Sequence, residues 1–246
     1  MSGPLGLHGG GEYVPGDEPF LDALITAAAR TPNAIGRPLR IVVVPTAAAR
    51  GMPDRAAANG VAAFERRAAV LAVPAAVEVA RVVDVASAAF PDLALAVECA
   101  DLVHLPGGDP DLLPAVLANS PVLASLRRAW AGGAVIAGAS AGAMALAEWT
   151  WTPRGGTRGL AFVHGLAVVP HYDDIRRTTW QEAVDRLAPG GIGYLGLDER
   201  TGVIAEADGT GTRRWVVAGP GAAWWFRRGA RHPVVARSGE VIELPV

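Results

Sequence analysis

The sequence predicts an α/β fold, namely an open, mostly parallel sheet with helices on both faces and an antiparallel C-terminal edge. Short apolar or β-branched runs alternate with Ala-rich stretches of helical length that carry Arg and Glu, as in parallel sheets covered by helices. One of the apolar runs is uninterrupted, which is typical of a strand buried on both faces. From residue 210 onward, turns alternate with short apolar runs, which indicates the antiparallel edge.

The clearest elements lie in the first half of the chain. Residues 40–45 (R-I-V-V-V-P) form an apolar run between a charge and a proline, which predicts a central strand. Residues 54–73 carry apolar side chains at helical spacing, and Pro53 suits the first turn of a helix. Residues 77–85 and 100–105 predict two further strands, and the second of them ends in P-G-G-D-P.

The remaining elements follow from the same patterns. Three helices are predicted before the C-terminal part, at residues 111–119, 121–130 and 141–149, with a buried strand at 134–139 between the last two. Beyond residue 159 the strand-like segments are 167–170, 194–197, 202–205, 215–218 and 234–236, and a helix is predicted at 177–187.

Length and composition restrict the class of protein. The 246 residues include 22 basic and 24 acidic side chains, a net charge of −2, and 51% are hydrophobic. We therefore expect a single α/β domain over residues 1–246 with a full core, and no fibrous or disordered class. The near-neutral charge argues against nucleic acid or an anionic membrane as the partner, so a small peptide is the expected partner.

Two further features concern the compartment. Cys99 is the single cysteine, so no internal disulfide can form, and no secretory signal pattern is seen at the start. These observations favour the cytoplasm. The longest uncharged stretch, residues 129–147, is broken by glycines and Ser140, so it indicates a strand, a turn and a helix instead of a membrane span.

The strongest chemical signal is G-A-S-A-G at residues 138–142. It stands between a predicted strand and a predicted helix, the context of a G-x-S-x-G nucleophile elbow. Such a turn would expose the hydroxyl of Ser140 and place the amide of Ala141 beside it, as half of an oxyanion hole. Gly107 and Gly108, which follow another strand, could supply the other half. The alternative is that Ser140 is a small turn residue in an Ala- and Gly-rich chain.

A serine nucleophile needs a general base, and the chain has 5 histidines. His171 is the best candidate because it follows a predicted strand, where side chains reach the carboxyl edge of a sheet; the alternative is a histidine of a surface loop. His104 lies inside an apolar strand and is better explained as a core residue. His232 lies in an Arg-rich tail, and His8 could border the site.

The third member of a triad should be a carboxylate that orients the imidazole. Glu199 in G-L-D-E-R is the preferred residue because it follows the strand-like segment 194–197. Three other carboxylates stay open as alternatives, namely Asp198, Asp173 and Asp174. A further alternative is that the Asp-Glu pair simply faces solvent.

Weaker signals surround these residues. G-G-G-E at residues 9–12 lacks the Lys of a P-loop and is interpreted as a flexible loop at the mouth of the site. Arg176 and Arg177 could hold a substrate carboxylate, although solvated arginines at a helix start are slightly favoured. No histidine pair has a metal-ligand spacing, so neither a metal nor another cofactor is expected. Four tryptophans are expected to be core or interface residues: Trp149, Trp151, Trp224 and Trp225.

Several motifs occur in one order along residues 9–203, namely G-G-G-E, V-V-V-P-T-A-A, L-P-G-G-D, G-A-S-A-G-A, P-H-Y-D and G-L-D-E. Together they resemble the cyanophycinase and dipeptidase E family of serine peptidases. The resemblance implies a class I glutamine amidotransferase-like fold with serine in place of the amidotransferase cysteine. It also implies a serine-type exopeptidase or dipeptidase that hydrolyses short peptides through an acyl-enzyme.

Carried onto this chain, the resemblance makes Ser140 the nucleophile, His171 the base and Glu199 its carboxylate partner. Gly108 and Ala141 would donate the oxyanion amides. Four more residues are expected near the substrate: Gly11, Asp109, Tyr172 and Arg176. The alternative is a catalytically silent member of the same fold that binds a small molecule or peptide; glutamine amidotransfer is disfavoured because the elbow carries serine. The sequence is compatible with a homodimer without determining the oligomeric state.

Overall fold

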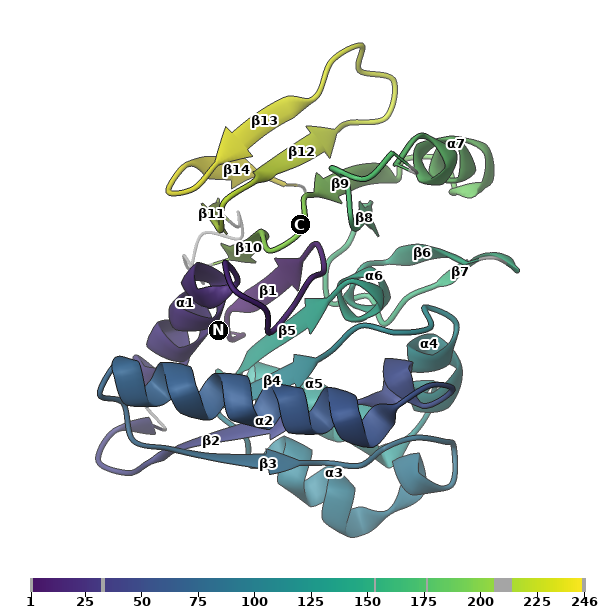
Figure 1. Ribbon diagram of the computed structural model, residues 1–246. Coiled ribbons are helices and arrows are strands. Elements are labelled where there is room, and N and C mark those ends of the chain that lie inside the picture. The colour runs from purple at the N-terminus through teal and green to yellow at the C-terminus, as the bar shows by residue number, and fades with distance from the viewer. Residues whose placement is uncertain (1, 32–33, 153, 176, 206–213, 245–246) are drawn as a thin grey trace.

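The main sheet of the protein has eight strands and is parallel over most of its width. The structure is a computed structural model that describes residues 2–31, 34–152, 154–175, 177–205 and 214–244 (Figure 1). The strand order is β14-β11-β10-β1-β5-β4-β2-β3. The pairs among β1, β5, β4, β2 and β3 are parallel, whereas β10, β11 and β14 are added antiparallel beside β1. The bounds are β1 Leu5–His8, β2 Leu39–Val43, β3 Ala75–Val79, β4 Leu102–Leu105, β5 Val135–Ala139, β10 Gly202–Ala205, β11 Arg214–Ala218 and β14 Val241–Glu243.

Helices cover both faces of this sheet because its strands are apolar on both sides. Ile41 and Val43 face one buried cluster, whereas Val42 between them faces another, as the period of two in a strand requires. Helices α1 and α2 pack in the first cluster; α3 to α6 pack in the second. In Figure 1, α2 crosses in front of the sheet. The bounds are α1 Glu18–Ala29, α2 Pro53–Val70, α3 Pro91–Glu98, α4 Leu112–Leu117, α5 Pro121–Ala131 and α6 Ala141–Leu146, with short 3₁₀ turns at Thr46–Ala48 and Ser87–Ala89.

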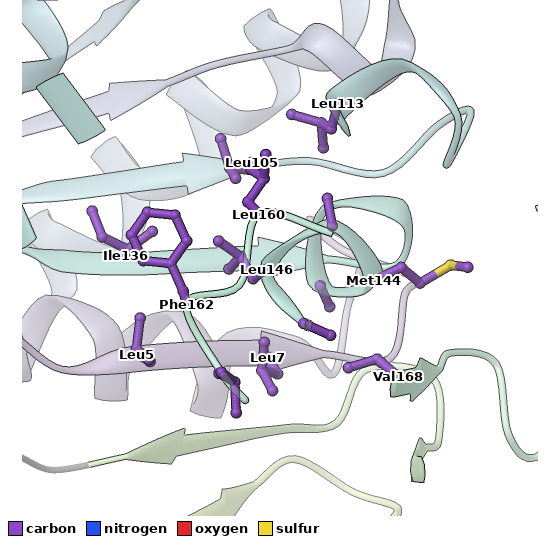
Figure 2. Close-up of a cluster of buried hydrophobic side chains, with 14 of the residues drawn as sticks. Leu5, Leu7, Leu105, Leu113, Ile136, Met144, Leu146, Leu160, Phe162 and Val168 are labelled. Carbon is purple, nitrogen blue, oxygen red and sulfur yellow. The ribbon is translucent and has the colours of Figure 1, made fainter. Parts of the chain in front are cut away.

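The larger cluster extends from the main sheet to a second one. Figure 2 shows Leu5, Leu7 and Ile136 of the main sheet beside Leu146 of α6 and Val168. Val168 belongs to a four-stranded sheet of order β13-β12-β9-β8, in which β8 and β9 are parallel. A two-stranded hairpin, β6-β7, and helix α7 complete the fold. Their bounds are β6 Trp149–Thr152, β7 Gly155–Arg158, β8 Leu166–Val169, α7 Arg177–Leu187, β9 Gly193–Leu197, β12 Ala222–Phe226 and β13 Val234–Arg237.

The predicted fold class is confirmed, including antiparallel strands at the C-terminus. Three predicted details differ. The strand predicted at 77–85 ends at Val79, and the helix predicted at 141–149 ends at Leu146. Alternating Trp and Thr residues from Trp149 form β6 instead, because aromatic and β-branched side chains favour a pleated, half-buried strand. At the C-terminus only β11 and β14 extend the main sheet, whereas β12 and β13 join the second sheet.

The uncharged stretch 129–147 is divided as predicted into the end of α5, strand β5 and helix α6. In the part of the chain that the structure describes, no helix has both the length and the apolarity to cross a membrane.

Candidate active site

Ser140 occupies a sharp turn directly after β5. Its backbone has φ 48° and ψ −112°, a strained conformation for a residue with a side chain, and its amide donates a 2.9 Å hydrogen bond to the carbonyl oxygen of His8. A Cβ atom at Gly142 would lie 1.9 Å from the carbonyl oxygen of Leu105, and one at Gly138 would lie 2.4 Å from the carbonyl carbon of Gly142. The glycines of the G-x-S-x-G pattern are therefore required by backbone contacts at the turn.

His171 is two residues beyond β8, and its ring reaches Ser140. The Nε2 atom of His171 lies 3.0 Å from Oγ of Ser140. The His171 backbone has φ 51° and is held by a 2.8 Å hydrogen bond from its amide to the carbonyl of Gly9. A Cβ atom at Gly10 would lie 2.3 Å from Cε1 of His171, so glycine at this position lets the loop after β1 pass against the imidazole ring.

Glu199 is the carboxylate that contacts the histidine. It stands two residues beyond β9, the parallel neighbour of β8, so both side chains reach the same edge of the second sheet. Oε1 of Glu199 lies 2.7 Å from Nδ1 of His171. Because an ionised carboxylate accepts only, Nδ1 carries the proton and Nε2 is free to accept the hydroxyl proton of Ser140.

The three carboxylates that the sequence left open as alternatives to Glu199 occupy other positions. Asp173 accepts a 3.0 Å hydrogen bond from the amide of Glu199. The Asp198 carboxylate accepts from the amide of Ala222 at 2.8 Å and from Nε1 of Trp224 at 3.1 Å, and burial raises the pKa of Asp198 above its usual value. Asp174 lies on the wall of the adjoining cavity. The carboxylate of Glu199 is hydrogen-bonded to the ring of His171, whereas the backbone amide of Asp174 donates to the carbonyl oxygen of His171 at 2.9 Å.

The expected oxyanion amides belong to the start of α6 and to the loop after β4. Ala141 follows it as the first residue of α6. Gly108 belongs to the loop after β4, where its φ is 150° and a Cβ atom would lie 2.2 Å from the carbonyl oxygen of Ala47. The neighbouring amide, that of Gly107, donates a 2.7 Å hydrogen bond to Oε1 of Glu12. Glu12 therefore fixes the orientation of this loop next to the serine, a contact that the sequence analysis did not foresee.

The two histidines of the main sheet, His8 on β1 and His104 on β4, are buried. Nε2 of His8 lies 2.9 Å from Oδ1 of Asp17, at ion-pair distance without the angle of a hydrogen bond. The expectation that His8 borders the site applies only to its backbone, which accepts from Ser140. Nδ1 of His104 lies 2.7 Å from the hydroxyl of Tyr13, and burial, followed by the charge of His8, lowers the pKa of His104 to about 3. His104 is thus a core residue, as predicted.

A cavity of about 440 Å³ opens in front of Ser140. Helix α7 contributes Trp180 and Arg177 to its wall, and strand β6 contributes Trp151. The sequence analysis did not place the two tryptophans at the site. Alternation in W-T-W-T was the available signal, because it puts Trp151 on the face opposite Thr150 and Thr152, which are buried. The full lining consists of Gly108, Pro110, Ser140, Trp151, Pro170, His171, Asp174, Arg177 and Trp180.

The four additional residues expected near the substrate have different positions. Gly11 is beside Glu199, whose Oε2 would be 3.5 Å from a Cβ atom there. Asp109 turns to Arg50, with which it pairs, and Tyr172 is buried against Trp224 and Phe226 of the second sheet; neither lines the cavity. Arg176 lies outside the described residues. Within those residues, no group of three or more His, Cys, Asp or Glu side chains could hold a metal ion.

Comparisons with known proteins point to a family of peptidases. The model of Peptidase family S51 matches residues 24–210. Among solved structures, a peptidase from an acI-B1 Actinobacterium is 26% identical with a TM-score of 0.82, over 99% of this chain and 98% of that one. A putative peptidase E protein from Listeria monocytogenes EGD-e has 13% identity and a TM-score of 0.53 over 96% and 99%, a likeness of fold alone. No curated protein matches the sequence.

Proposed function

Because the chain belongs to Peptidase family S51, the cyanophycinase and peptidase E family, we propose that this serine peptidase is an exopeptidase or dipeptidase acting on short peptides through an acyl-enzyme on Ser140. The observation that carries the proposal is a continuous hydrogen-bond chain. It runs from Oγ of Ser140 to Nε2 of His171 at 3.0 Å, and from Nδ1 of His171 to Oε1 of Glu199 at 2.7 Å. Nucleophile, base and orienting carboxylate require this order of contacts.

In the proposed reaction, Oγ of Ser140 attacks the peptide carbonyl carbon while Nε2 of His171 takes the hydroxyl proton. The carboxylate of Glu199 stabilises the resulting imidazolium. The amides of Gly108 and Ala141 donate to the oxyanion of the tetrahedral intermediate. His171 then gives its proton to the leaving amine, and the C–N bond breaks. Water, deprotonated by the same histidine, hydrolyses the ester and restores the serine.

The size of the cavity supports short substrates. At about 440 Å³, it lies near the lower end of the roughly 300–1,000 Å³ typical of small-molecule sites. Its walls come from the loop after β4, the hairpin strand β6 and helix α7. A site of this volume fits a few amino-acid residues better than a long folded chain, which is the reason for proposing an exopeptidase or dipeptidase.

Release of free amines from a panel of dipeptides and isoaspartyl dipeptides tests the proposal. We expect the wild type to cleave members of the panel and Ser140→Ala to lose this turnover while keeping its unfolding transition. Ser238→Ala, which removes a hydroxyl from an exposed turn, is the matched control and should retain full activity. A folded wild type that cleaves no peptide would instead indicate a member of the fold that binds its ligand without turnover.

A further inference from the structure

Two tryptophans from different elements line the cavity that contains Ser140. The ring centroids of Trp151 on β6 and Trp180 on α7 are 5.1 Å apart with an interplanar angle of 56°. Both side chains are only partly buried, and both line the cavity that contains Ser140. Partly exposed apolar surface inside a concave site is typical of a surface that a ligand covers.

The local structure explains why Trp151 faces the cavity. Thr150 and Thr152, its neighbours on β6, have exposed fractions of 0% and 2%, so strand alternation directs Trp151 to the opposite face. Trp180 packs with its inner side against the hydrophobic core while a further part stays accessible. Packing against the core therefore restricts the two rings, while part of each ring stays accessible. A ligand could bind there at little cost in side-chain entropy.

The remaining lining residues indicate which side chains this wall would accept. Pro110 and Pro170 add further apolar surface. Asp174 and Arg177, the acidic and basic side chains on the lining, have opposite charges. The charges of the lining residues that the structure describes therefore cancel when His171 is neutral, so these residues give no net electrostatic preference for either an acidic or a basic substrate.

We propose that Trp151 and Trp180 form a side-chain subsite that selects a substrate residue with a large apolar or aromatic side chain next to the cleaved bond. This inference rests on the proposed peptidase function and adds the class of side chain to it. Aromatic rings pack against each other in tilted or offset geometry and bury large apolar areas, and partial burial of a phenyl group at this wall corresponds to about a tenfold gain in kcat/KM over alanine.

Two dipeptide series test the subsite, one varying the N-terminal residue and one the C-terminal residue, each with Ala, Leu, Phe, Asp and Arg. We expect Phe and Leu to exceed Ala, Asp and Arg in one series by about tenfold in kcat/KM. Trp180→Ala and Trp151→Ala should each remove this advantage, so that the ratio of kcat/KM between the Phe and Ala peptides falls toward unity. Phe90→Ala removes an exposed ring from a distant turn and should leave the preference intact.

The outcomes separate the subsite from the proposed function. Cleavage of Ala-Ala and of the Phe peptides at equal rates, or a preference that survives both tryptophan variants, would overturn the subsite and leave the peptidase standing. Binding supplies a readout that needs no turnover. Calorimetry on Ser140→Ala should show that Ala-Phe or Phe-Ala binds about tenfold tighter than Ala-Ala, and Ser140→Ala combined with Trp180→Ala should abolish the difference. Equal binding of all three peptides refutes the subsite even if no peptide is cleaved.

Discussion

The two sheets contribute to the active site in different ways. The main sheet supplies Ser140 and the flanking amides, and it holds them by backbone packed on backbone: a Cβ atom at Gly142 or Gly108 would lie 1.9 or 2.2 Å from a carbonyl oxygen. The second sheet supplies His171 and Glu199. Their side chains meet in one hydrogen bond, between Nδ1 of His171 and the Glu199 carboxylate, and their amides donate to the carbonyl oxygen of Gly9 and to Asp173.

This difference predicts different consequences of mutation on the two sides. Backbone packing in a buried turn cannot relax, so changes on the main-sheet side should reduce stability before they reveal any effect on chemistry. The side chains of His171 and Glu199 are 31% and 44% exposed, so changes there should reduce activity with little effect on the fold. For this reason the experiments below measure stability, turnover or both.

Among the variants that compare the two sheets, Glu199→Gln should reduce activity most. The amide can donate to Nδ1 of His171, which favours the tautomer with its proton on Nε2 and removes the acceptor for the Ser140 hydroxyl. We expect kcat to fall roughly 10³–10⁴-fold, with the unfolding free energy changed by less than about 0.5 kcal/mol because the side chain is near the surface. Steady-state kinetics together with urea unfolding measure both quantities. A kcat within tenfold of the wild type would remove Glu199 from the catalytic machinery.

Gly142→Ala, unlike Glu199→Gln, should mainly reduce the stability of the fold. The added methyl group would meet the carbonyl oxygen of Leu105 at 1.9 Å, so α6 must move away from the end of β4, and we expect a loss of unfolding free energy of about 4 kcal/mol or more. Gly190→Ala is the control, because a Cβ atom there meets nothing within 4 Å; its stability should be unchanged or slightly raised. If Gly142→Ala unfolded like the wild type, the contrast between the two sheets would be wrong.

The same contrast explains how far the sequence could predict this site. Ser140, His171 and Glu199 each lie within two residues of the end of a strand, and a local pattern of apolar run and turn locates such positions well. The sheet to which a strand belongs depends on distant partners, so the patterns at 215–218 and 234–236 did not reveal that β11 and β13 lie in different sheets. Trp180 was missed for a similar reason. Its helix was predicted, but its ring contacts that of Trp151, which lies 29 residues earlier on β6.

Glu12 links the loop after β1 to the loop after β4, and its removal should have an intermediate effect. Glu12→Ala deletes the acceptor of the 2.7 Å hydrogen bond from Gly107, which leaves the adjoining Gly108 amide less well oriented. We expect kcat to fall roughly 10–100-fold with little change in KM, since the oxyanion forms only during reaction. Glu12→Gln retains an acceptor oxygen and should recover most of the activity. A rise in KM at constant kcat would instead assign Glu12 to substrate binding.

The smallest expected effect lies in the core of the main sheet, at His104. Its pKa is lowered to about 3, first by burial and then by the charge of His8, whereas an unfolded histidine titrates near 6.5. Between these two values the unfolded chain binds a proton that the folded chain does not, so the unfolding free energy decreases as the pH falls, by up to about 1.4 kcal/mol per pH unit. Above pH 6.5 this contribution to stability is fully present.

His104→Gln isolates this contribution from the carboxylates, which titrate in both proteins. Glutamine can still accept from the hydroxyl of Tyr13, whose own pKa is raised by burial, so the phenol stays protonated throughout the range. Urea unfolding of both proteins at pH 7, 6 and 5 should show the wild type losing roughly 1–2 kcal/mol more than the variant. Parallel curves would mean that His104 gains a proton in the folded state as easily as in the unfolded one, and acid sensitivity would then have to come from the other titratable groups.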